Sequence, residues 1–221
     1  MTRIHPARPG SEFRVRNVEE QTFLSFPRDD LLRAADLCAE AFFESPHIRY
    51  FFPDRSRRKG ASAGLFEMRI RYALLYGEVH ITTSELEGLA AWIPAACAQM
   101  TMWRQIRAGG IQLRHTVGAS AVGRMTNVAC HNDVLRRRNA PSEHWLLSIL
   151  AVRPSCQHQG FASHLLTPKL HESDEKRITI YLETTEDMLV PLYEHYGFIA
   201  REHSPVPTSD LLVCAMTRSP R

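Results

Sequence analysis

The sequence predicts an α/β fold, and three segments of the chain carry this prediction. Residues 144–152 are an almost unbroken apolar run, which is typical of a strand buried on both faces. A polar turn with Pro154 ends that strand, and from Gly160 onward apolar residues recur at the spacing of one helical face. Residues 178–184 are rich in β-branched side chains and predict another strand. Strands and helices therefore alternate in this half of the chain.

Length and composition predict one globular domain. The chain has 221 residues, of which 44% are hydrophobic and 23% charged, so it can bury a sizeable core. We expect residues 1–20 to be a loose lead-in and residues 21–221 a single domain with a helical insertion at about 97–143. No apolar run reaches membrane-spanning length, and no signal-peptide pattern opens the chain. We therefore expect a cytoplasmic protein that does not bind membranes.

Charge and cysteine usage exclude several partners. A net charge of +3 is too small to indicate nucleic acid binding, and we expect the basic runs at 55–59 and 136–138 to be solvated faces. The five cysteines are odd in number, widely spaced and without a C-x-x-C pair. That pattern argues against a disulfide framework and against a zinc site, so no metal is expected.

The first half of the chain predicts a strand, two helices and a hairpin, in that order. Residues 22–27 are β-prone, and Asp29 and Asp30 then stand where a helix cap and acidic first turn belong, before helical spacing up to Phe42. An aromatic cluster at 50–53 precedes a helix over 60–76. Residues 78–83 and 86–94 read as a hairpin.

The second half begins with the least regular segment. Residues 95–143 predict two or three helices, with a break at Gly109-Gly110. After the central strand, we expect the helix from Gly160 to bend near Pro168. A helix over 188–196 and strands over 198–202 and 211–216 complete the prediction.

The junction between the central strand and its helix has the properties of an anion site. The first helical turn leaves its N–H groups free, and the helix dipole adds about half a positive charge there. Gly160 has no Cβ, so a phosphate can approach the backbone.

Two blocks of sequence resemble the GNAT acetyltransferase family. Gln157-His158-Gln159-Gly160-Phe161-Ala162 matches its Q/R-x-x-G-x-G/A signature, preceded by an L-x-V-x-P strand end at 150–154. Residues 181–198 resemble the family's closing strand and helix, including its Y-x-x-x-G-F ending. The resemblance implies a mixed, mostly antiparallel sheet of six or seven strands with helices on both faces. Trp92-Ile93-Pro94-Ala95 further resembles a strand end of the puromycin-type branch.

The resemblance implies acetyl-CoA as the acyl donor and assigns residues to it. The signature would hold the pyrophosphate through backbone N–H groups, with the Ser163 hydroxyl added. The central strand would part from its neighbour and offer its freed backbone to the pantetheine arm and thioester carbonyl. The residues assigned to the cofactor are Leu150, Ala151, Val152, Gln157, His158, Gln159, Gly160, Phe161, Ala162 and Ser163.

Three residues are candidates for proton transfer. Tyr193 occupies the position of the family's tyrosine, which faces the cofactor sulfur, and a phenol can supply a proton to the departing thiolate. Glu183, near the end of its strand, or His144, at the start of the central strand, could take the ammonium proton directly or through a water. The sequence does not decide between them.

Departures from the family pattern leave a second function open. Relatives carry asparagine where this chain has Glu186 and Leu189. The main prediction is N-acetyl transfer to a small-molecule amine by direct attack, and the alternative is a catalytically degenerate acyl-CoA-binding sensor or interaction module. Cys156 as a nucleophile is a third route, whereas the phosphate-loop and dinucleotide motifs are missing. The acceptor's identity is open, and so is homodimer formation. We expect the acceptor pocket between the helices around 42–52, the strand end at Trp92 and the inserted segment, where Glu44 or Glu183 could meet the acceptor's charge.

Overall fold

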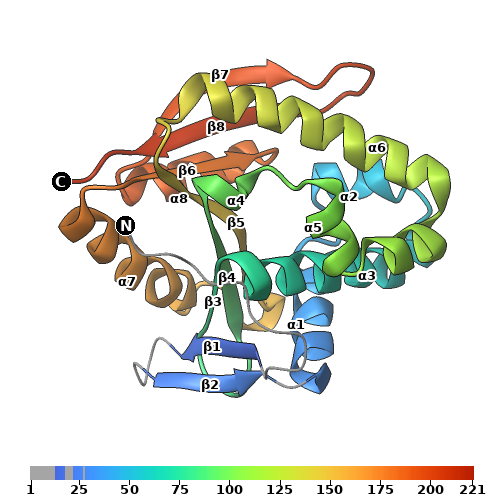
Figure 1. The fold of residues 1–221 in the computed structure, drawn as a ribbon, viewed down its shortest axis with the longest axis horizontal. Coiled ribbons are helices and arrows are strands. Elements are labelled where there is room, and N and C mark those ends of the chain that lie inside the picture. Colours follow the sequence, from blue (N-terminus) through green and yellow to red (C-terminus); the bar gives the residue numbers. More distant parts are fainter. Residues whose placement is uncertain (1–12, 18–21, 27) are drawn as a thin grey trace.

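One sheet forms the centre of the protein in the computed structural model, which describes residues 13–17, 22–26 and 28–221. The strand order is β2-β1-β3-β4-β5-β6-β8-β7 (Figure 1). Neighbouring strands run antiparallel except β1 with β3 and β5 with β6. The strands are β1 (Phe13–Asn17), β2 (Thr22–Phe26), β3 (Glu78–Ile81), β4 (Gly88–Pro94), β5 (His144–Val152), β6 (Thr179–Thr184), β7 (Ile199–Pro205) and β8 (Leu212–Arg218). The predicted mixed, mostly antiparallel α/β fold class is confirmed.

The N-terminal strand was not expected. The described part of the chain forms eight strands rather than six or seven, and the additional one is β1. It lies inside the segment 1–20 that we expected to be an irregular lead-in, and it pairs with β2 on one side and β3 on the other. The rest of that expectation, on residues 1–12 and 18–20, lies outside the described residues.

Helices cover both faces of the sheet, as predicted. On one face α1 and α3 pack over the core, and on the other α7 and α8 do so (Figure 1). Strand β4 shows why both faces are apolar, because Leu89 and Ala91 belong to the first core cluster and Ala90 and Trp92 to the second. The helices are α1 (Arg28–Ala41), α2 (Pro46–Phe51), α3 (Arg55–Tyr76), α4 (Ala95–Ala98), α5 (Met102–Arg107), α6 (Gly110–Asn139), α7 (Phe161–Lys176) and α8 (Val190–His195).

The insertion before β5 is helical, as expected. It consists of the short α4 and α5 and the long α6. Gly109, in the left-handed conformation with φ 101°, separates α5 from α6, and Gly118 interrupts α6 with non-helical angles. The second part of α6 reaches the edge of the cleft between β5 and β6, where Asn132 contacts Glu183. Within the described residues, no helix is long and apolar enough to cross a membrane.

The two basic runs are not uniformly solvated, which corrects the sequence-based expectation. Arg58 is buried and donates to the carbonyl oxygens of Phe52 and Pro53. Arg136 is also buried and forms an ion pair with Asp133. In each run one arginine therefore turns inward, where backbone carbonyls or a carboxylate satisfy its donors.

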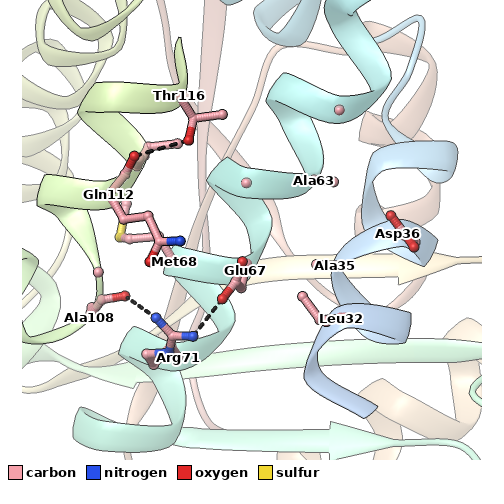
Figure 2. A pocket seen from close by; sticks show the side chains of 14 residues that line it. Leu32, Ala35, Asp36, Ala63, Glu67, Met68, Arg71, Ala108, Gln112 and Thr116 are labelled. Carbon is pink, nitrogen blue, oxygen red and sulfur yellow. Dashed lines mark hydrogen bonds and ion pairs between the residues drawn. The ribbon is translucent and has the colours of Figure 1, made fainter. Parts of the chain in front are cut away.

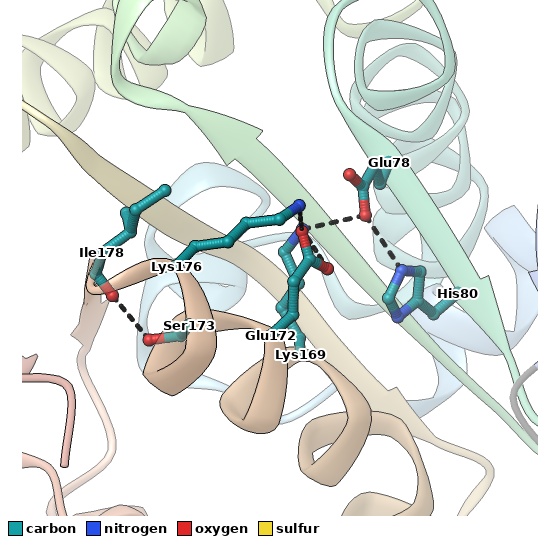
Figure 3. Close-up of polar contacts among 7 residues, drawn as sticks. All are labelled: Glu78, His80, Lys169, Glu172, Ser173, Lys176 and Ile178. Atoms are coloured by element: carbon teal, nitrogen blue, oxygen red, sulfur yellow. Dashed lines mark hydrogen bonds and ion pairs between the residues drawn. The ribbon is translucent and has the colours of Figure 1, made fainter. Parts of the chain in front are cut away.

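A buried lysine ties helix α7 to strand β3. The ammonium of Lys169 is fully buried and lies 2.9 Å from Glu78 and 3.1 Å from Glu172 (Figure 3). The same nitrogen lies 3.5 Å from the centre of the Trp145 ring. Although burial raises the pKa of Glu78, the hydrogen bond with His80 and the charge of Lys169 bring it down to about 2. The cluster thus fixes the helix that begins at Gly160 against the sheet.

Replacing Lys169 with alanine is expected to destabilise the fold. The change leaves two carboxylates without their shared cation and should lower the free energy of unfolding by about 3 kcal/mol, as breaking buried ion pairs does. Lys176→Ala is the matched control, because Lys176 pairs with the same Glu172 while its side chain is 58% exposed. That variant should change stability by less than about 1 kcal/mol. Urea unfolding of both variants checks this, and equal effects would contradict the expectation.

Candidate active site

Strands β5 and β6 separate after a short stretch of parallel pairing. The pairs run from His144–Thr179 to Leu146–Tyr181 and then stop, although both strands continue. Beyond that point β5 stays paired with β4, with a bulge that leaves Ser148 without a partner in the register. Within the described residues, no strand pairs with this edge of β5 beyond Leu146, so backbone groups there are left for another partner. This is the parting of the strands that the family resemblance implied.

A cleft of about 120 Å³ occupies the gap. Side chains from β5, β6, β8, α2, α3, α6 and α8 surround it, together with Phe42 just after α1. Leu150, Glu183 and Tyr193 are among them. The structure thus brings together three of the residues that the sequence nominated. Ala151 and Val152 continue β5 beyond the cleft toward the loop, and His144 lies at the opposite end of the strand.

The loop after β5 has the expected junction with α7. Gly160 precedes the helix in the left-handed conformation, with φ 86°, which glycine adopts at little cost. A Cβ built at Gly160 meets no atom within 4 Å, so the space in front of the backbone is open. The side chains of Gln157 and Gln159 fold back onto backbone carbonyls of Val152 and Ser155, and His158 is exposed. The first-turn N–H groups of Phe161, Ala162 and Ser163 follow at a helix N-terminus.

Tyr193 presents a phenol to the cleft. Its ring is 7% exposed and packs edge-on against Phe198 at 5.8 Å between centroids. Within the described part of the chain its hydroxyl makes no hydrogen bond. Burial, and secondly the charge of Glu186, raise the pKa of Tyr193 above its ordinary value. The phenol is therefore protonated at neutral pH and free to donate.

Glu183 faces the other side of the cleft. Asn132 donates to one of its carboxylate oxygens at 3.2 Å, and the other is buried without a partner among the described residues. Burial raises the pKa of Glu183 to about 7, against the lowering effect of the nearby Arg136 charge. A carboxyl group with this pKa is about half ionised at neutral pH, which suits a general base.

His144 is held away from the cleft. Its Nδ1 lies 2.7 Å from the carbonyl oxygen of Pro141, its ring packs edge-on against Tyr181, and its Nε2 is buried without a partner in the described structure. Burial lowers its pKa, so the imidazole is neutral at neutral pH. Of the two candidate bases, Glu183 lines the cleft and His144 does not.

Glu186 and Leu189, the departures from the family pattern, both line the cleft. The carboxylate of Glu186 accepts a hydrogen bond from Ser45, in the turn before α2. It is therefore held by the α1–α2 turn and not by the loop at Gly160, where the phosphates are expected. Leu189 packs against the apolar cluster under α7 and α8.

The acceptor side differs from the sequence-based picture in two residues. Trp92 was expected at the acceptor pocket, but it is fully buried in the cluster beneath α7 and does not line the cleft. Glu44 was a candidate for the acceptor's charge, but it pairs with Arg55 and Arg58. Neither residue lines the cleft, because the strand face that a side chain occupies and its local ion pairs depend on packing that the sequence does not show.

Three polar residues of the cleft were missed by sequence reasoning. Arg69 on α3 donates to Ser148 at 3.4 Å, His47 on α2 lies 3.1 Å from the hydroxyl of Thr185, and Asn132 contacts Glu183. Burial and secondly the charge of Arg69 lower the pKa of His47 to about 3, so this imidazole is neutral. No local motif marks these positions, since each comes from a different helix.

A larger cavity of about 340 Å³ lies elsewhere, between α1, α3 and the start of α6. Figure 2 shows Arg71 on its wall, paired with Glu67 and directed at the carbonyl of Ala108. None of the residues predicted for catalysis or cofactor binding lines it.

Comparisons with known proteins identify the family of the chain. Residues 82–218 match the family model of the acetyltransferase (GNAT) domain. An uncharacterized N-acetyltransferase of Schizosaccharomyces pombe is 24% identical over 181 residues, which cover 78% of this chain and 72% of that protein.

Solved structures share the fold. A structure described as histone acetyltransferase HPA2 and related acetyltransferase, from Corynebacterium glutamicum, aligns with a TM-score of 0.62 at 24% identity, over 88% of this chain and 93% of that one. Arylalkylamine N-acetyltransferase 2 from Aedes aegypti aligns with a TM-score of 0.53 at 9% identity, over 89% and 98% of the two chains. Since the family model spans more than half of the sequence, this chain belongs to the GNAT family of acetyltransferases.

Proposed function

We propose that this protein transfers the acetyl group of acetyl-CoA to the amine of a small molecule by direct attack. The observation that carries the proposal is the cleft where β5 leaves β6, with Tyr193 and Glu183 both on its walls. Acetyl-CoA supplies a thioester whose carbonyl carbon the amine attacks. The branch resemblance at Trp92–Ala95 and a cytoplasmic location stay predictions.

The chain offers a binding element for each part of such a donor. The open backbone at Gly160 and the N–H groups of Phe161, Ala162 and Ser163 would hold the pyrophosphate. The backbone of Leu150–Val152 lies on the free edge of β5 and would hold the pantetheine arm and the thioester oxygen. Buried N–H donors aimed at a developing oxyanion contribute about 3 kcal/mol each to the transition state.

Glu183 and Tyr193 would divide the proton transfers. Ionised Glu183 takes a proton from the amine nitrogen, and the Tyr193 hydroxyl donates to the sulfur as the carbon–sulfur bond breaks. Because Tyr193 has a raised pKa, its proton moves only when negative charge has built up on sulfur. Exchange with solvent then restores both groups.

Amine-dependent release of free thiol from acetyl-CoA tests the proposal. Wild-type protein is incubated with acetyl-CoA and single amines, and each acetylated product is identified by mass spectrometry. Turnover with at least one amine supports the enzyme. Acetyl-CoA binding without turnover across a broad amine set would favour the sensor or interaction module instead.

The pH dependence separates the two candidate bases. The carboxyl group of Glu183 acts as a base only when ionised, and its pKa is raised to about 7, so kcat/KM should fall as the pH drops through about 7. In Glu183→Gln this limb should disappear and kcat/KM above pH 8 should drop about 100-fold, the scale of general base catalysis. His144→Gln should keep the limb, and its loss in that variant would instead assign the base to His144.

A further inference from the structure

Arg69 brings a positive charge into the cleft that the protein itself does not neutralise. Its guanidinium comes from α3, lines the cleft, and makes one side-chain hydrogen bond, to Ser148 at 3.4 Å. Within the described residues it forms no ion pair. By contrast, Arg71 on the same helix pairs with Glu67.

The groups facing Arg69 do not replace an anion. His47 is neutral and Cys38 is a buried thiol whose pKa burial raises, so neither carries negative charge at neutral pH. Glu183 acts on Arg69 through space from β6, without a direct ion pair. A guanidinium has five N–H donors, and taking it out of water is costly unless an acceptor pairs with it. A bound ligand with an anionic group would supply such an acceptor.

Four apolar side chains line the cleft near Arg69 and Glu183, and the cleft is small. They are Phe42, Phe51, Phe66 and Val128, whereas the Glu186 carboxylate in the same cleft is held by Ser45. The whole cleft measures about 120 Å³, on the scale of cavities that hold one small ring. An acceptor molecule that fits this cleft is therefore compact. Its apolar part lies against the phenylalanines, and its two polar groups reach Glu183 and Arg69.

We propose that the acceptor is a small amino acid-like molecule, in which the amine faces Glu183, a carboxylate pairs with Arg69, and an apolar side chain packs on Phe42 and Phe51. This inference rests on the proposed acetyl transfer. The guanidinium matches a carboxylate in shape and can bind both oxygens at once. Arg69 would then determine specificity and take no part in the proton transfers.

Matched acceptors test the charge requirement in the wild-type protein. L-Leucine is compared with isopentylamine, and L-phenylalanine with phenethylamine, which lack only the carboxylate. The methyl esters of both amino acids keep the shape without the charge. With acetyl-CoA as donor, kcat/KM should be about 10- to 100-fold higher for the amino acids. A charge-assisted hydrogen bond to the substrate typically contributes a factor of about this size. Equal or better turnover of the decarboxylated amines or esters would overturn the inference.

Arg69→Gln tests the residue. It should remove the preference for the amino acids, measured as the ratio of kcat/KM for each amino acid to that for its decarboxylated amine. Because the lost charge acts on Glu183 equally for both acceptors, its effect on the base cancels in this ratio. Arg71→Gln is the control, because it makes the same change two residues along α3 and outside the cleft. It should keep the preference. A preference that survives in Arg69→Gln would contradict the assignment.

Calorimetric titration of the amino acids in the presence of CoA separates this inference from the proposed function. Arg69-dependent binding without turnover would support the carboxylate site and contradict acetyl transfer. Turnover of simple amines, with neither binding nor turnover of amino acids, would support acetyl transfer and overturn the carboxylate site. The absence of both would overturn both.

Discussion

Gly160→Glu should abolish acetyl-CoA binding, with at least a 100-fold rise in Kd measured by calorimetry. The substitution puts a carboxylate into the open space before the first turn of α7, where the pyrophosphate is expected. The new carboxylate and the pyrophosphate are both negative, so they repel each other in a partly desolvated site. The side chain also blocks the approach of the pyrophosphate to the backbone.

Two further variants separate charge from backbone strain. Gly160 has φ 86°, so any side chain there adds about 1 kcal/mol of strain to the fold. Gly160→Ala introduces the backbone strain with only a methyl group. Gly160→Gln adds a side chain of the same size as Glu but without its negative charge. Affinity should fall in the order Ala, Gln, Glu, while all three stay folded by circular dichroism. Wild-type affinity in Gly160→Glu would place the phosphates elsewhere.

Tyr193→Phe should lower kcat about 100-fold while the KM for acetyl-CoA changes little. The substitution removes only the hydroxyl, which makes no hydrogen bond within the described residues, and keeps the ring against Phe198. The loss would therefore fall on the departure of the thiolate, a step in which a positioned acid contributes about 100-fold or more.

Tyr196→Phe is the control for this change. Tyr196 lies one turn further along, outside the residues that line the cleft. Its substitution should leave kcat unchanged, and both variants should keep wild-type thermal stability. If Tyr193→Phe retains wild-type kcat, another group or water protonates the thiolate.

The sequence predicted most of the sheet because its strands follow strong local patterns. The apolar run at 144–152 became β5 with the predicted bounds, and the hairpin at 78–94 became β3 and β4. Strand β1 was missed although Phe13-Arg14-Val15-Arg16 alternates apolar and polar residues and its partner β2 begins at Thr22. The pattern is only five residues long, and the other partner, β3, lies more than sixty residues away in the chain. The long-range pairing of β1 with β3 leaves no signal of its own in the local sequence.

Some residues of the site could be predicted from local motifs, and others could not. The loop at Gly160 and the tyrosine at 193 have motifs that place them, and the structure puts them at a helix N-terminus and at the cleft. Arg69 and Asn132 have no such motif, since each looks like an ordinary polar residue of a helix surface. Only the packing of α3 and α6 against the parted strands brings them to Glu183.

A crystal structure with bound CoA tests the central claim most directly. We predict the pyrophosphate against the backbone of residues 157–163 and the sulfur between β5 and β6, within hydrogen-bonding distance of the Tyr193 hydroxyl. CoA bound in the larger cavity between α1 and α3, or bound with its sulfur away from the parted strands, would contradict the proposed active site.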